Sequence, residues 1–368
     1  MRTAIAGLAA LAVAMGVGRF AFTPLLPMMQ GDAGVSLAQG GHLAAANYLG
    51  YLAGALWAMR PARADVAIRI SLLTIAVATL AMGVTHGMPA WVWWRTVAGV
   101  ASAWALVQVS SWCLQELAAL GKPELGGVVF SGVGWGIALA GALCLALMAA
   151  GANSSQAWIA LGTVSLLAGA VLWPIVARRD AAATATAGNG LTWTADATRL
   201  VLCYGVFGFG YIIPATFVPV MARDIIADPL VFGWAWPIFG TTAALSTLFI
   251  ARRDNRRVWA IAALVMAGGV AAPMVVPGIA GVVGSALLVG GTFMVITMAG
   301  MQEARQVGGP ALMAAMTAAF ATGQIAGPLA VSALVHMRGG MSAALSIAAV
   351  SLILSGLALG WKERPCPT

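Results

Sequence analysis

Residues 126–150 read GGVVFSGVGWGIALAGALCLALMAA, a run of 25 residues without a charged side chain. A helix rises about 1.5 Å per residue and the hydrocarbon core of a bilayer is about 30 Å thick, so about 20 apolar residues are enough to cross it. This run is therefore predicted to be a membrane-spanning helix. Similar stretches fill most of the rest of the chain.

The apolar stretches predict an all-α integral membrane protein with twelve transmembrane helices. The predicted spans cover residues 4–28, 37–59, 70–85, 91–117, 126–150 and 157–177, followed by 197–222, 230–250, 258–277, 281–304, 311–335 and 341–361.

The composition of the whole chain agrees with this prediction. Of its 368 residues, 61% are hydrophobic and only 8% are charged, whereas soluble domains carry about 25% charged residues. This excludes a soluble enzyme, a nucleic-acid-binding domain and a disordered chain. The four cysteines and three histidines are scattered, and there is no Walker-type sequence, so neither a metal site nor a cofactor is expected.

The positions of the cations predict the orientation. If the N-terminus is inside, 15 of the 19 Lys and Arg residues lie in cytoplasmic segments, Arg223 and Arg338 lie outside, and Arg19 and Arg95 lie within spans. Such a bias places both termini in the cytoplasm, and the Arg- and Ala-rich usage favours a bacterial inner membrane. The alternative, that the first span is a signal peptide, would leave an odd number of spans and disturb the charge alternation.

A polar interruption divides the chain into two halves. Residues 1–177 and 197–368 each hold six predicted spans, and 178–196 form a predicted cytoplasmic linker. Similar motifs recur across the division: Gly16-Val17-x-x-Phe20 matches Gly205-Val206-x-x-Phe209, and Gln115-Glu116 matches Gln302-Glu303. Near-equal offsets of 189 and 187 residues indicate an internal repeat.

Particular residues then identify a family. The segment GVGRFAFTPLLP at residues 16–27 resembles the first-helix signature of the YbfB/YjiJ group of major facilitator superfamily transporters. Weaker similarities lie at Ser131–Ile137, Gly291–Phe293, Gln302–Arg305 and Phe320–Pro328. The resemblance implies the two-bundle fold and a transporter, but it fixes no substrate. The chain departs from the wider superfamily after the second span, where Gly54-Ala55-Leu56-Trp57-Ala58 lacks the usual Asp.

Two buried cations suggest the substrate. Arg19 is predicted to lie roughly 22 Å from the inner face and Arg95 roughly 6 Å from the outer face, both in the outer half of the bilayer. Charge at that depth is costly and marks a functional candidate, and a guanidinium suits a carboxylate or phosphate. The alternatives are that Arg95 snorkels to the interface beside its tryptophans and that Arg19 has an internal structural role.

Further candidates are polar residues within spans or at their ends. Asn47, Trp135 and Gln324 are predicted to line the substrate site, although helix–helix contact is the commoner use of such residues. Glu116, Glu303 and Arg305 stand at the predicted cytoplasmic ends of spans four and ten. We expect these acids to pair with loop cations and form a cytoplasmic gate; the alternative is solvated charge.

The predicted function is a secondary transporter, and not an enzyme, that moves a small organic solute, with an anion favoured. Its predicted partners are that substrate and membrane lipid, not nucleic acid, with a monomer expected and a proton left open as coupling ion. Two alternatives are a membrane enzyme acting on lipid, which lacks a visible catalytic cluster, and a non-transporting sensor, which would need a longer soluble segment.

Overall fold

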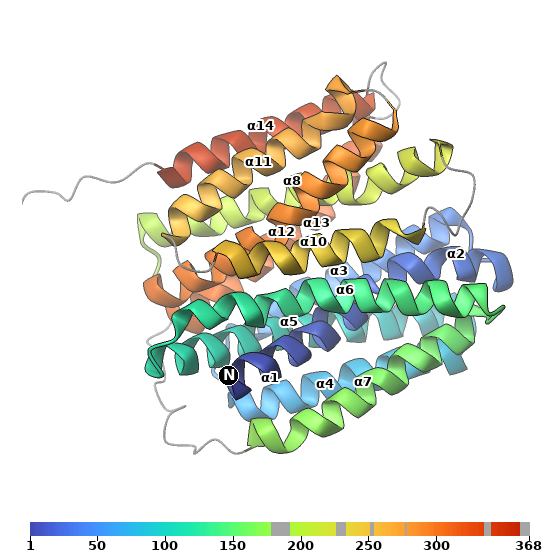
Figure 1. The fold of residues 1–368 in the computed structure, drawn as a ribbon, viewed down its shortest axis with the longest axis horizontal. Coiled ribbons are helices and arrows are strands. Elements are labelled where there is room, and N and C mark those ends of the chain that lie inside the picture. The colour runs from blue at the N-terminus through green and yellow to red at the C-terminus, as the bar shows by residue number, and fades with distance from the viewer. Residues whose placement is uncertain (178–191, 226–232, 251–253, 277, 335–339, 361–368) are drawn as a thin grey trace, which may run out of the picture.

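The computed structural model describes residues 1–177, 192–225, 233–250, 254–276, 278–334 and 340–360. Within these ranges all regular elements are helices, and most of them run roughly parallel along the long axis (Figure 1). The linker predicted at 178–196 lies largely outside the described residues, as do the last eight residues of the chain.

The first part of the chain forms helices that fill the lower part of the view in Figure 1. They are α1 (Arg2–Leu11), η1 (Ala12–Phe20), α2 (Phe22–Asp32), α3 (Leu37–Trp57), α4 (Ala64–Val84), α5 (Met88–Ala119), η2 (Pro123–Leu125), α6 (Gly126–Ala149) and α7 (Ser154–Ala177).

The second part forms the yellow-green to red helices, most of which lie above the others in the same view. They are α8 (Ala195–Ile225), α10 (Ala235–Ile250), α11 (Asn255–Val275), α12 (Ile279–Val307), α13 (Gly309–Leu334) and α14 (Gly340–Gly360). Extensive contacts between α6 and α10, and between α3 and α13, join the two parts.

Ten helical segments in the described ranges are long and apolar enough to cross a membrane. The predicted number of twelve is not reached by this criterion. The other two predicted positions hold α3, whose apolar run contains Gln39, His42 and Asn47, and α10, which has 16 described residues. The structure thus supports a multi-pass membrane protein, with helices close to each predicted range.

The predicted start of the third span was wrong. Helix α4 begins at Ala64 rather than residue 70, with Asp65 in its first turn. A carboxylate is favourable at a helix N-terminus because of the helix dipole, and Asp65 also pairs with Arg63 at 3.0 Å. Charged residues therefore extend this helix beyond its apolar part.

The contact between α6 and α10 depends on glycine. A Cβ at Gly134 would lie 2.3 Å from the backbone nitrogen of Ala244, and one at Gly240 would lie 2.4 Å from that of Ala138. Small residues let membrane helices approach closely where no hydrophobic force drives them together. These two glycines therefore allow the close approach of α6 and α10.

Candidate functional site

The first membrane segment carries Arg19 on a π-helical stretch. Residues Ala12–Phe20 form η1, and the N–H of Ala21 donates to the Gly16 carbonyl five residues earlier, at 2.8 Å. A wider helical turn of this kind is rare and frequently marks a functional site. Arg19 near its end is only 3% exposed.

The guanidinium of Arg19 reaches across to the second half of the chain. Its Nη2 donates a hydrogen bond to Oε1 of Gln324 on α13, which is fully buried. Aromatic rings surround the cation, and the ring of Tyr51 is nearest, at 4.1 Å from Cζ. The other three rings within cation–π distance belong to Phe20, Tyr48 and Phe320, at 5.3, 5.6 and 5.5 Å.

Asn47 and Arg95 connect the backbones beside this cation. The amide nitrogen of Asn47 donates to the carbonyls of Gly18, at 3.3 Å, and Arg95, at 3.0 Å. Nη2 of Arg95 donates to the carbonyl of Arg19 at 3.4 Å, and its guanidinium lies 4.6 Å from the ring of Phe22. Arg95 is 3% exposed, so its side chain is enclosed by neighbouring helices.

Several buried polar atoms of this cluster have no hydrogen-bond partner. They are Nε and Nη1 of Arg19, Nε of Arg95, Nε2 of Gln324 and the acceptor Oδ1 of Asn47. Among the described ion pairs none involves Arg19 or Arg95. The cluster therefore combines two cations with spare donors and no carboxylate partner, an arrangement that can accept an anion.

An aromatic layer continues from Arg19 into the second half. Phe20 packs edge-on against Phe293 of α12 at 5.8 Å, and Phe293 stacks on Tyr211 of α8 at 4.4 Å. Phe207 of α8 lies 5.0 Å from Phe320 of α13. The two cations thus lie beside a layer of flat, apolar aromatic rings.

A profile of the family described as "Uncharacterised MFS-type transporter YbfB" matches residues 11–359. The chain belongs to this family. Similar solved structures include the crystal structure of the human organic anion transporter MFSD10 (TETRAN), at a TM-score of 0.74 and 15% sequence identity over 97% of this chain and 99% of that one. At that identity the similarity shows the fold alone. No curated protein sequence is significantly similar to the chain.

In this MFS-type transporter Glu303 takes part in a network of ion pairs. Nε of Arg256 lies 2.5 Å from Oε1 of Glu303, and Nη1 of the same arginine lies 2.8 Å from Oδ1 of Asp196. Arg199 also pairs with Asp196. The network joins α8, α11 and α12, all within the second half.

The partner expected for Glu303 needs a correction. We expected a loop cation, whereas the observed partner, Arg256, lies in the first turn of α11. No described ion pair involves Arg305, which is half-buried. Glu116 is half-buried near the end of α5.

The predicted substrate-site residues fall into two groups. Arg19, Asn47, Arg95 and Gln324 are brought together by the hydrogen bonds above. Trp135 is half-buried on α6, and none of the described contacts joins it to them. Sequence reasoning missed Tyr48 and Tyr51, although they lie beside Asn47 on the same helix, where one turn separates residues 47 and 51.

Proposed function

We propose that this MFS-type transporter moves a small organic anion across a bacterial inner membrane by alternating access. The observation that carries the proposal is the buried guanidinium of Arg19, whose Nε and Nη1 lack partners. A charge at membrane depth costs several kcal/mol by insertion scales (about 2.5–3.5 kcal/mol), so it is retained where it is used or compensated. A bound carboxylate would supply the missing acceptors.

The surroundings of Arg19 favour a particular binding geometry. The planar guanidinium can bind a carboxylate through two parallel N–H donors. The two donor pairs of the Arg19 guanidinium are Nε with Nη2 and Nη1 with Nη2, and both include Nη2, which donates to Gln324. We therefore propose that a bound carboxylate shares or displaces the oxygen of Gln324, while the unpartnered Nε2 of Gln324 becomes a further donor to it.

The aromatic layer favours an anion with an apolar body. Rings of Tyr51, Phe20 and Phe320 lie within 5.5 Å of the Arg19 guanidinium carbon. The aromatic rings of the protein can stack on a flat apolar group of the substrate, such as an aromatic ring. An organic carboxylate thus suits this site better than a small inorganic anion. The fold neighbour MFSD10 is named an organic anion transporter, which agrees with the proposal.

Alternating access requires the two halves to rock about the central site. The hydrogen bond between Arg19 and Gln324 crosses between those halves, so anion binding would change a contact that holds them together. The network of Asp196, Arg256 and Glu303 would stabilise one arrangement of the second half at the predicted cytoplasmic end.

The proposal is tested by transport into proteoliposomes. Purified protein is reconstituted, and counterflow of a labelled aromatic carboxylate is compared with that of the corresponding amine and amide. Exchange of the carboxylate alone, lost in Arg19→Gln and kept in Arg60→Gln, is the expected result. Exchange of the amine or amide, unaffected by Arg19→Gln, would overturn the organic-anion proposal.

A further inference from the structure

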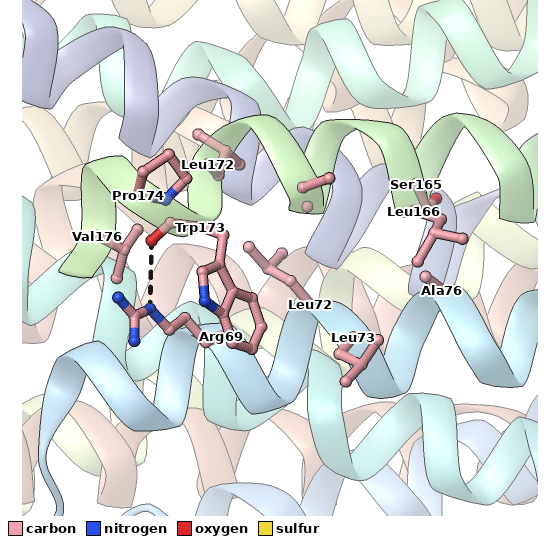
Figure 2. A pocket seen from close by; sticks show the side chains of 12 residues that line it. Arg69, Leu72, Leu73, Ala76, Ser165, Leu166, Leu172, Trp173, Pro174 and Val176 are labelled. Carbon is pink, nitrogen blue, oxygen red and sulfur yellow. Dashed lines mark hydrogen bonds between the residues drawn. The ribbon is translucent and has the colours of Figure 1, made fainter.

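A groove runs along the contact between α4 and α7, on the outside of the first half of the chain. Figure 2 shows Arg69 and Trp173 at one end of it and Ser165, Leu166 and Ala76 at the other. Its volume is about 360 Å³. From this groove we infer a binding site for one acyl chain of an anionic phospholipid, with the lipid phosphate held by Arg69.

The walls of the groove are almost entirely apolar. Along α4, residues Arg69 to Ala76 extend roughly 10 Å, and along α7, residues Ser165 to Val176 extend roughly 16 Å. One leaflet contributes about half of the 30 Å hydrocarbon core, so the groove matches the depth of a single leaflet. The one polar wall residue besides Arg69, Ser165, donates to the Leu161 carbonyl at 2.9 Å and is satisfied.

Arg69 is held in place but keeps donors free for a ligand. Its Nε donates to the Trp173 carbonyl at 3.2 Å, and its guanidinium lies 5.0 Å from the Trp173 ring. The hydrogen bonds of the described residues engage neither of its terminal nitrogens. Two N–H groups of a fixed guanidinium are well suited to phosphate oxygens, and Trp is typical of the membrane interface.

The position of α7 favours lipid as the occupant. Only 28% of the most apolar stretch of α7 is buried within the protein, compared with 78% for the first membrane span. Acyl chains are as apolar as the groove walls, so burial alone gives little selectivity between lipids. Selectivity must come from the headgroup, and the local charge is positive.

The acid one turn before Arg69 on α4 is paired with another cation. Asp65 pairs with Arg63 at 3.0 Å rather than with Arg69. Arg69 lies in the second turn of α4, at the end of the helix that the cation distribution predicts to be cytoplasmic. Anionic headgroups are abundant there and are attracted to basic clefts between helices. The structure therefore points to an anionic lipid of that leaflet.

The chain offers a matched control. Arg60 lies 4.6 Å from the ring of Trp57, which reproduces the Arg–Trp pair without contributing to the groove. A second variant blocks the groove and leaves the charge. A Cβ at Gly169 would meet only the Cβ of Leu72, at 4.0 Å, so Gly169→Leu can be accommodated while its side chain fills the space.

The experiment measures lipid retention by the full-length, detergent-purified protein in native mass spectrometry. The probes are phosphatidylglycerol and phosphatidylcholine with identical acyl chains, with inorganic phosphate as competitor. We expect tighter binding of phosphatidylglycerol, about fivefold weaker in Arg69→Gln and similarly weakened in Gly169→Leu. Arg60→Gln should bind like the unaltered protein, and millimolar phosphate should not compete.

Three results would overturn the inference. Equal binding of the two lipids would show that Arg69 does not recognise the headgroup. Undiminished binding in Gly169→Leu would show that the acyl chain does not occupy the groove. Equal losses in Arg69→Gln and Arg60→Gln would indicate surface charge in general. Size-exclusion profiles of all variants show whether each is folded. Arg69→Gln alters the headgroup contact and Gly169→Leu fills the groove, so if one variant misfolds the other still tests the inference.

Discussion

Nη2 of Arg19 donates a hydrogen bond to Oε1 of Gln324, and the two residues are 305 positions apart in the chain. The bond links η1 in the first half to α13 in the second. Both side chains are buried, and each keeps donor nitrogens without partners. In the proposed function, the amide of Gln324 occupies the place that a substrate carboxylate would take.

Substitution at Gln324 should separate two effects. In Gln324→Glu a permanent carboxylate would face Arg19, and we expect at least about a tenfold weaker affinity for anions, because the protein's own anion competes. Gln324→Ala frees Nη2 but removes the Nε2 donor proposed to contact the anion, so its affinity for anions should fall less than that of Gln324→Glu. Titration by thermal shift measures both affinities. Equal behaviour of the two variants would contradict the displacement of Gln324 by substrate.

Asn47 should contribute to stability rather than to charge recognition. Its amide donates to two carbonyls on different helical segments, and a buried hydrogen bond contributes about 0.5–1.5 kcal/mol. We expect Asn47→Leu to lower the free energy of unfolding by about 1–2 kcal/mol and to reduce transport in proportion to folded protein. Unfolding in denaturant checks this. An unchanged stability would show that these bonds contribute nothing net.

The ion pair between Glu303 and Arg256 is partly shielded, with side-chain exposures of 11% and 28%. We expect Glu303→Gln to shift the balance between inward-open and outward-open states by about fivefold, because such a pair contributes about 1 kcal/mol. Cysteine accessibility from each side of the membrane measures the shift. Asp65→Asn, which removes the more exposed pair with Arg63, is the control. Unchanged transport kinetics and accessibility in Glu303→Gln would rule out a gate there.

The contact between α6 and α10 should be sensitive to one methyl group. Gly134→Ala would place a carbon 2.3 Å from the backbone of Ala244, and relief of such overpacking costs typically about 1–3 kcal/mol. We expect reduced stability and slower transport. At Gly284 a Cβ would meet no atom within 4 Å, so Gly284→Ala should be neutral or slightly stabilising. Similar effects of both variants would refute the close approach.

Much of the fold could be predicted from the sequence because membrane helices are constrained by one requirement, the apolar length. Boundaries were wrong where that requirement ends: α4 starts at Ala64 because charged residues can occupy its first turns. The π-helical turn before Ala21 could not be predicted, since it depends on a backbone hydrogen bond to Gly16 that no local residue pattern specifies.

The candidate site was predicted in part, through the cost of burying polar groups. That cost singles out Arg19, Arg95 and Asn47, and the structure places them in contact. It does not say which distant residue meets Arg19, because pairing between the halves depends on tertiary packing. That cost says nothing of Trp135, because an aromatic residue between glycines can face either a cavity or a neighbouring helix. Arg256 was not singled out because the predicted span starts at residue 258, yet this arginine lies in the first turn of α11.

The most direct test of the account is whether Arg19 is required for anion binding. Purified protein and the variants Arg19→Gln and Arg60→Gln are compared by thermal shift against aromatic carboxylates, amines and amides. A ligand at 100 times its Kd stabilises the folded state by about 2.7 kcal/mol. The account predicts stabilisation by carboxylates alone, absent in Arg19→Gln and retained in Arg60→Gln. Stabilisation by amines or amides that persists in Arg19→Gln would contradict it and make this arginine structural.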